Sequence, residues 1–136
     1  MYITRSVEGK KAWREASEFL KSQPPVGALR RVACLDRSAM LMVSDAVENN
    51  IIGYVDTKNR TPFERMKETC LINEGSESIA YGFMSARLAV IQLLVDDSVE
   101  DRNHRLTLFK NFTQVGIAAR AFPPDFASIV IIDLLY

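Results

Sequence analysis

The stretch Asp96-Asp97-Ser98-Val99-Glu100-Asp101-Arg102-Asn103-His104-Arg105 contains the single histidine of this 136-residue chain. Four carboxylates precede the imidazole, and a guanidinium follows it directly. Histidine is the side chain that most readily changes its charge near neutral pH, and nearby charges affect that change. His104 is therefore a candidate functional residue, and the elements on either side of it determine the expected fold.

The overall charge of the chain is balanced, with 17 lysine and arginine residues against 17 aspartate and glutamate residues. Because no net positive field is available, we expect no nucleic-acid partner. The length suits one domain with a single core. The longest apolar run, from Leu88 to Val95, is far shorter than the roughly 20 residues of a membrane-spanning helix.

The N-terminal segment, from Met1 to Lys11, lacks the apolar core of a signal peptide. The sequence thus predicts a cytoplasmic protein or a mature fragment whose leader is missing. Cys34 and Cys70 show neither a Cys-x-x-Cys spacing nor a cysteine and histidine cluster. We expect them to be buried, reduced thiols, unless the protein is secreted.

Apolar residues at helical spacing predict a first helix from Lys10 to Gln23, which Pro24-Pro25 ends. The same pattern predicts a second helix from Asp36, its expected N-cap, to Asn49. A further helix begins at Thr61, where Glu64 completes a capping box, and ends near Glu68.

Ser85 is the expected N-cap of a helix that runs to Val95 and is apolar on nearly all sides, which indicates a buried, central helix. Three segments have the composition of strands: Glu77 to Tyr81, Gln114 to Arg120 and Ser128 to Leu135. The last two can pair as a hairpin across Ala121 to Ala127. We therefore expect an α+β fold with one small antiparallel sheet and helices on both of its faces.

From Leu29 onward the chain resembles the CAP superfamily, the SCP-like domains of cysteine-rich secretory proteins and plant pathogenesis-related proteins. Five segments match family motifs in order: the helix from Leu35 to Ala46, the turn Gly53-Tyr54-Val55-Asp56-Thr57-Lys58-Asn59, Pro62-Phe63-Glu64-Arg65, Ser76-Glu77-Ser78-Ile79-Ala80-Tyr81-Gly82, and the stretch around His104. The resemblance implies a three-layer α-β-α sandwich. It places this domain at residues 29–136, with residues 1–28 as an N-terminal helix and proline-rich connection in one compact unit.

The resemblance also implies a cleft, which in the family holds two histidines and two acidic residues. Glu77 and His104 match two of these positions, Tyr54 replaces the other histidine, and Asp96 or Asp97 is nearest to the second acid. We expect Glu77 to pair with His104 across the cleft. Because tyrosine is a poor zinc ligand beside imidazole, we expect no cofactor and no tight metal site. His104 and Glu77 are the only weak candidates for metal ligands.

The function that the resemblance implies is a non-enzymatic, extracellular binding module that recognises a lipid, a sterol or a protein partner through a surface cleft. One alternative is a divergent hydrolase or metal-dependent enzyme that uses His104 and Glu77. Another is a degenerate CAP scaffold whose cleft has lost its chemistry. The two side chains could also be a structural pair that only holds the layers together.

Overall fold

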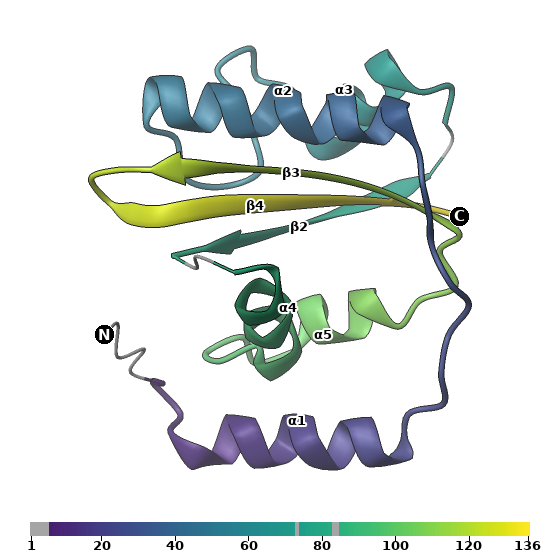
Figure 1. Ribbon diagram of the computed structural model, residues 1–136, viewed down its shortest axis with the longest axis vertical. Helices are drawn as coiled ribbons and strands as arrows, with labels where there is room; N and C mark the ends of the chain where they lie inside the picture. The colour runs from purple at the N-terminus through teal and green to yellow at the C-terminus, as the bar shows by residue number, and fades with distance from the viewer. Residues whose placement is uncertain (1–5, 73, 83–84) are drawn as a thin grey trace.

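A four-stranded sheet lies between two pairs of helices in the computed structural model, which describes residues 6–72, 74–82 and 85–136 (Figure 1). The helices are α1 (Lys10–Ser22), α2 (Ala33–Asn49), α3 (Pro62–Thr69), α4 (Ala86–Val95) and α5 (Asn103–Leu108). The strands are β1 (Arg30–Arg31), β2 (Gly75–Tyr81), β3 (Gln114–Phe122) and β4 (Phe126–Leu135). The mixed α+β fold that the sequence predicts is confirmed.

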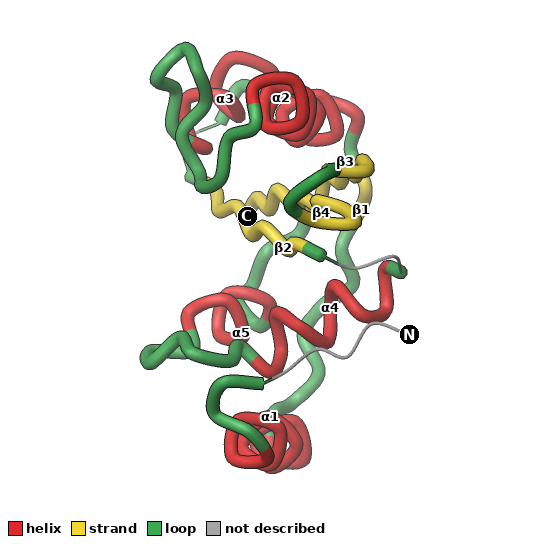
Figure 2. Tube along the Cα trace, turned by 90° about the vertical axis from the view of Figure 1, so that its left-hand side faces the viewer, coloured by secondary structure: helices red, strands yellow, loops and turns green. Residues whose placement is uncertain are grey.

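The layers stack in a fixed order. Helices α2 and α3 cover one face of the sheet, α4 and α5 cover the other, and α1 lies outside α4 and α5 (Figure 2). Residues 23–29 leave α1 as an extended and mostly exposed segment that passes beside the α4–α5 layer to the sheet (Figure 1). In the part of the chain that the structure describes, no helix is long and apolar enough to cross a membrane.

The strand order is β1-β3-β4-β2. Strands β2, β4 and β3 pair antiparallel, as the sequence predicts, and β3 and β4 form the expected hairpin. Strand β1 adds a short parallel pairing with β3, in which Arg30 faces Gln114. A strand of two residues is too short to show an alternating apolar and polar pattern, so β1 could not be predicted from the sequence.

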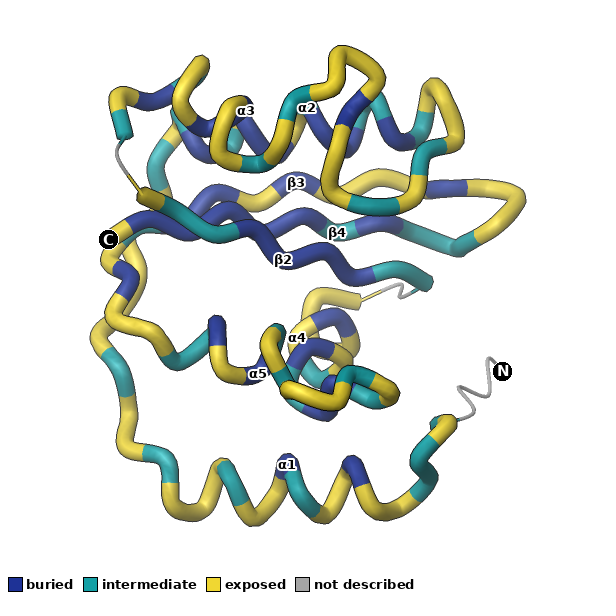
Figure 3. The backbone as a smooth tube through the Cα atoms, turned by 180° about the vertical axis from the view of Figure 1, so that it is seen from behind, coloured by how far each residue is buried: buried dark blue, intermediate teal, exposed yellow. Residues whose placement is uncertain are grey.

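Alternate residues of the central strands face opposite helix layers, because side chains along a strand alternate between its two faces. Ile79 and Ile131 pack against α2, whereas Ala80 and Ile132 belong to the core on the α4 side. Buried residues gather where the sheet and its helices face one another (Figure 3). Each helix pair thus closes its own apolar core on one side of the sheet.

The start of α2 differs from the prediction because Asp36 is not its N-cap. The helix begins at Ala33, and the Asp36 carboxylate instead accepts the Ile117 N–H of β3 at 2.9 Å and binds the Arg31 guanidinium at 3.0 Å. The sequence pattern of a cap residue is local, whereas the side chain is used in a contact between two elements. This contact fixes the beginning of α2 on the edge of β3.

The other two predicted caps are confirmed. The Thr61 hydroxyl accepts the Glu64 N–H, and the Glu64 carboxylate accepts the Thr61 N–H at 2.7 Å. Ser85 accepts the Leu88 N–H at 3.2 Å. The expected burial of α4 holds for only part of the helix: Ala89, Leu93 and Val95 are buried, whereas Leu88 is 45% exposed.

Cys34 and Cys70 form a disulfide, so the expected reduced thiols are wrong. Cys34 lies in the first turn of α2, and Cys70 is the residue that follows α3. These two helices pack side by side on the same face of the sheet and bring the two Cα atoms to 5.3 Å. The pairing depends on this tertiary contact, which the spacing of 36 residues does not reveal.

Candidate functional site

Three of the predicted site residues form one hydrogen-bonded chain. Asp96, the buried residue that ends α4, contacts the His104 Nδ1 atom with Oδ1 at 2.8 Å. The Tyr54 hydroxyl lies 2.9 Å from the other ring nitrogen, Nε2. Tyr54 comes from the loop between α2 and α3, and His104 comes from α5 on the other side of the sheet. The hydrogen-bonded chain therefore joins the two helix layers that flank the sheet.

The Asp96 carboxylate also fixes the backbone at the start of α5. Its Oδ2 atom accepts the N–H of His104 at 2.9 Å and that of Arg105 at 3.2 Å. The same side chain therefore holds both the imidazole and the peptide that carries it, which leaves His104 little freedom to rotate toward another partner.

The hydrogen bonds define the protonation pattern of a neutral imidazole. A carboxylate can only accept, so Nδ1 donates its hydrogen to Asp96 and Nε2 accepts the hydroxyl hydrogen of Tyr54. Burial raises the pKa of the Tyr54 phenol, and the nearby negative charge of Glu77 adds to this effect. The phenol thus stays protonated and acts as the donor.

Glu77 does not pair with His104, and that prediction is wrong. Both carboxylate oxygens of Glu77 accept hydrogen bonds from Arg65 Nη2, at 2.8 and 2.9 Å, and both side chains are completely buried. Arg65 also donates through Nη1 to the backbone carbonyls of Tyr54 and Arg60. The partner of Glu77 is thus a residue of α3, on the opposite face of the sheet from His104.

Arg65 is the functional neighbour that sequence reasoning missed. It stands in the matched segment Pro62-Phe63-Glu64-Arg65, but nothing local distinguishes it from a solvated arginine on a short helix. A fully buried arginine requires a charged partner. Only the approach of α3 to β2 shows that Glu77 is that partner.

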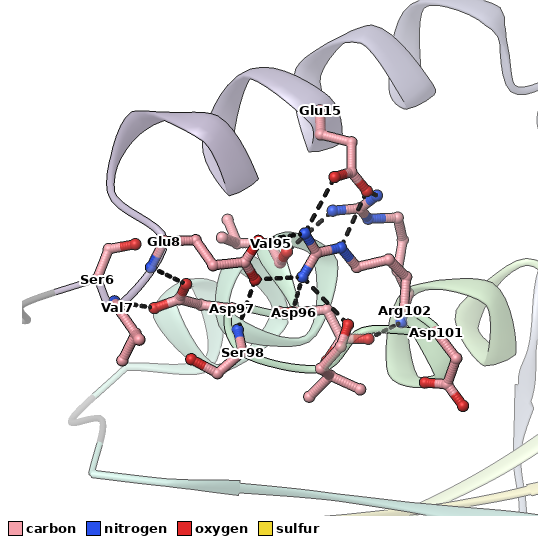
Figure 4. Close-up of polar contacts among 12 residues, drawn as sticks. Ser6, Val7, Glu8, Glu15, Val95, Asp96, Asp97, Ser98, Asp101 and Arg102 are labelled. Atoms are coloured by element: carbon pink, nitrogen blue, oxygen red, sulfur yellow. Dashed lines mark hydrogen bonds and ion pairs between the residues drawn. The ribbon is translucent and has the colours of Figure 1, made fainter.

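Asp97, the other acidic candidate, has a different role. Its carboxylate accepts the backbone N–H groups of Val7 at 2.6 Å and Glu8 at 3.0 Å (Figure 4). It therefore attaches the segment before α1 to the acidic loop, residues 96–102 between α4 and α5. It takes no part in the hydrogen-bonded chain of Asp96, His104 and Tyr54.

The same loop holds α1 through arginine. Arg102 binds the carboxylates of Glu8 and Glu15 (Figure 4). Arg105 binds Glu15 at 2.7 Å. Hydrogen bonds lower the pKa of Glu8 and Glu15 from 4.5 to about 2; Arg102 contributes most to both, the Ser98 N–H adds to the effect on Glu8, and Arg105 adds to the effect on Glu15. Asp97, Arg102 and Arg105 thus join the outermost helix and the segment before it to the rest of the protein.

The donor set at this site does not suit a metal ion. The described residues contain no group of three or more histidine, cysteine or carboxylate side chains arranged around a common point. Glu77 is neutralised by Arg65, and the Nε2 lone pair of His104 is taken up by Tyr54. The absence of a metal and of a cofactor remains a prediction.

A small apolar hollow lies near the acidic loop, between α1 and α4. Its volume is about 100 Å³. It is lined by Ser6, Trp13, Leu88, Ile91, Gln92, Val95 and Asp97. Trp13 is 51% exposed and Leu88 is 45% exposed, so two large apolar side chains stand in solvent at its margin. The apolar character of α4 is the sequence signal for this surface, although the same pattern also predicts burial.

No family model matches the sequence, and no curated protein matches it. Two solved structures share its fold. An extracellular protein containing an SCP domain from Bacillus anthracis str. Ames aligns with a TM-score of 0.64 and 18% identity over 81% of this chain. An outer surface protein from Borrelia burgdorferi aligns with a TM-score of 0.68 and 17% identity over 97% of each chain.

These likenesses show the fold. The chain spans about a third of the length of the B. anthracis protein, since the alignment covers 34% of it. The helix and sheet arrangement described above is consistent with the CAP-like fold that the sequence resemblance implies.

Proposed function

We propose that this chain is a non-enzymatic binding module of the CAP type, which recognises a protein partner at the hollow between α1 and α4. The observation that best supports a binding role over catalysis is that the polar side chains of the expected cleft hold one another. Arg65 occupies both oxygens of Glu77, and the two ring nitrogens of His104 are occupied by Asp96 and Tyr54. A general base must be able to reach a substrate proton. The Glu77 side chain is completely buried, and the acceptor nitrogen of a neutral His104 is occupied by Tyr54.

The enzyme alternative draws some support from the order of carboxylate, imidazole and hydroxyl in Asp96, His104 and Tyr54, which is the order that activates a nucleophile in many hydrolases. The phenol is the weak element of this arrangement. Its pKa is raised by burial and by the charge of Glu77, so its ionised, nucleophilic form is disfavoured. We therefore prefer the binding role.

The size of the hollow favours a protein partner over a lipid or sterol. Sites for small molecules usually enclose about 300–1,000 Å³, and the hollow measures about 100 Å³. A sterol ring system does not fit this volume, whereas one aliphatic or aromatic side chain does. Exposed tryptophan at the margin suits such a contact, because tryptophan is enriched at the energetic centres of protein interfaces.

Trp13 is the only tryptophan of the chain, so its fluorescence reports directly on this surface. Peptides without tryptophan are selected from a displayed library on the immobilised protein and are then titrated into the soluble protein. We expect the selected peptides to share a bulky apolar residue and to change the emission of Trp13. We also expect Leu88→Asp to weaken their binding at least tenfold, because it places a charge in the apolar hollow.

The matched control is Leu71→Asp, which introduces the same change at a fully exposed position outside the hollow. It should leave binding unchanged. Peptides that bind Leu88→Asp with the same affinity as the unmodified protein would contradict the proposed surface. Saturation of the Trp13 signal by one equivalent of oleate or cholesterol would instead identify a lipid module, and failure to select any peptide would support the degenerate scaffold.

The extracellular location is part of the same proposal. The Cys34–Cys70 disulfide supports it, because disulfides persist in oxidising compartments and are rare in the cytosol of most organisms. The two structural neighbours are named as extracellular and outer-surface proteins.

A further inference from the structure

A buried polar cluster lies on the other side of the sheet from the hollow, under α2 and α3. Asp133 of β4 is the cross-strand partner of Glu77 in β2, and odd-numbered residues of both strands face these helices. Ser38 of α2 and Arg65 of α3 cover the pair. Asp133, Ser38 and Arg65 are completely buried.

The hydrogen bonds of this cluster are incomplete. Arg65 satisfies both oxygens of Glu77. Among the described residues, Ser38 Oγ, Arg65 Nε and both carboxyl oxygens of Asp133 have no hydrogen-bond partner. Buried polar atoms are almost always paired, and an ionised carboxylate without a donor is especially unfavourable in the interior.

The charges of the cluster do not balance if both acids are ionised. The single guanidinium of Arg65 can neutralise one carboxylate, and its two Nη2 contacts assign it to Glu77. The groups that face Asp133 are Glu77 from β2, Arg65 from α3 and Ser38 from α2, while its β3 neighbour is Gly116, which adds no side chain. A second negative charge would therefore remain uncompensated.

We propose that Ser38, Arg65, Glu77 and Asp133 form a buried proton-binding site, in which Asp133 is a carboxylic acid at neutral pH and shares its proton with Glu77. Cross-strand neighbours have Cβ atoms about 4.5–5.5 Å apart, so the two carboxyl groups are within reach of one proton. A protonated Asp133 also becomes a hydrogen-bond donor and removes the excess charge. Burial raises the pKa of Asp133 to about 8, and the adjacent charge of Glu77 contributes to the increase.

The proton couples stability to pH with a defined sign. The unfolded chain loses this proton at the ordinary pKa of aspartate, near 3.8, whereas the folded protein keeps it up to about pH 8. The folded state thus binds one more proton between these values, and stability falls as the pH rises through this interval. Each pH unit within it reduces the equilibrium constant for folding about tenfold.

The first experiment detects the acid itself. Infrared spectroscopy of the unmodified protein at about pH 7 should show the C=O stretch of a carboxylic acid, because exposed carboxyl groups are ionised there. The band should disappear above about pH 9 and should be absent from Asp133→Asn. Absence of the band from the unmodified protein at pH 7 would overturn the proposal even if the variant did not fold.

The second experiment measures the linkage by urea unfolding between about pH 5 and pH 8. Asparagine has the shape of the protonated acid but does not titrate. The equilibrium constant for folding of the unmodified protein, divided by that of Asp133→Asn, should therefore fall about tenfold per pH unit. Asp125→Asn, at an exposed position in the β3–β4 turn, is the matched control and should keep the decrease. Identical pH dependence of Asp133→Asn and the unmodified protein would contradict the site.

Discussion

Gly116 shows how strictly a single position is constrained. A Cβ atom on Gly116 would lie 2.1 Å from the carbonyl carbon of Leu35 and 2.4 Å from the backbone nitrogen of Asp36. Both obstacles are backbone atoms at the start of α2, which cannot move without shifting the helix. The absence of a side chain therefore allows α2 to approach β3, and this approach places Asp36 on the strand edge.

We predict that Gly116→Ala lowers the free energy of unfolding by at least about 3 kcal/mol, the upper end of the usual cost of overpacking. Urea denaturation measures the change. Gly27→Ala is the matched control, since no heavy atom lies within 4 Å of its added Cβ, and it should be nearly neutral. Equal stability of the two variants would mean that α2 does not rest on β3 in this way.

Helices α2 and α3 form a unit that is closed covalently as well as by packing. The disulfide joins the beginning of α2 to the end of α3 and encloses a loop with a sequence separation of 36 residues. The loop between them contributes Tyr54, and α3 contributes Arg65. The disulfide thus limits the motion of the loop that carries Tyr54 and of α3, whose Arg65 binds Glu77.

We predict that Cys34→Ala combined with Cys70→Ala lowers the free energy of unfolding by about 3–4 kcal/mol, because a loop of this length gains conformational entropy in the unfolded chain. Thermal or urea unfolding of the double variant measures the loss. The unmodified protein in excess reductant should behave in the same way. An unchanged stability in both samples would show that the disulfide does not constrain the unfolded chain.

Local elements were more predictable than the contacts between them. The capping box at Thr61 and the cap at Ser85 involve residues three positions apart, so their sequence patterns contain all the information needed. The pairing of Glu77 with Arg65 depends on how α3 approaches the sheet, and the disulfide depends on how α3 approaches α2. For the same reason, the sequence placed His104 in the site but assigned it the wrong carboxylate.

The whole molecule contains one layer beyond the three-layer sandwich that the resemblance implies. Helix α1 lies outside the layer of α4 and α5 (Figure 2). It buries Ala12 and Ala16 against Ile91 and Val95 of α4. Phe19 of α1 also packs edge-to-face against Phe109, with ring centroids 5.3 Å apart. Ion pairs of Arg102 with the carboxylates of Glu8 and Glu15 complete the attachment (Figure 4). This outer layer is therefore the part of the fold that responds most directly to acid.

We predict that α1 detaches from the fold before the sheet unfolds as the pH falls. The depressed pKa values of Glu8 and Glu15 mean that their contribution is complete above about pH 4.5 and is lost as the pH falls through about 2. Hydrogen exchange, corrected for intrinsic rates, should show α1 amides losing protection in this interval while those of β4 keep it.

Arg102→Gln is the control for this prediction, because it removes the charge that depresses both pKa values. Amides of α1 in this variant should already be less protected at pH 5 and should depend less on further acidification. Loss of protection in α1 and β4 at the same pH would show that α1 is not a separate unit.

The exposed connection between α1 and the sheet has a practical consequence. A protease that cuts within residues 23–29 would break no strand and no helix, since the segment contains neither. The two fragments would then form a non-covalent complex. Arg102, Arg105, the contact of Phe19 with Phe109 and the small contact with α4 would hold α1 and the preceding segment. A synthetic peptide with the sequence of the N-terminal fragment could be added back to the larger fragment, so that complementation would measure the affinity of the outer layer for the sandwich directly.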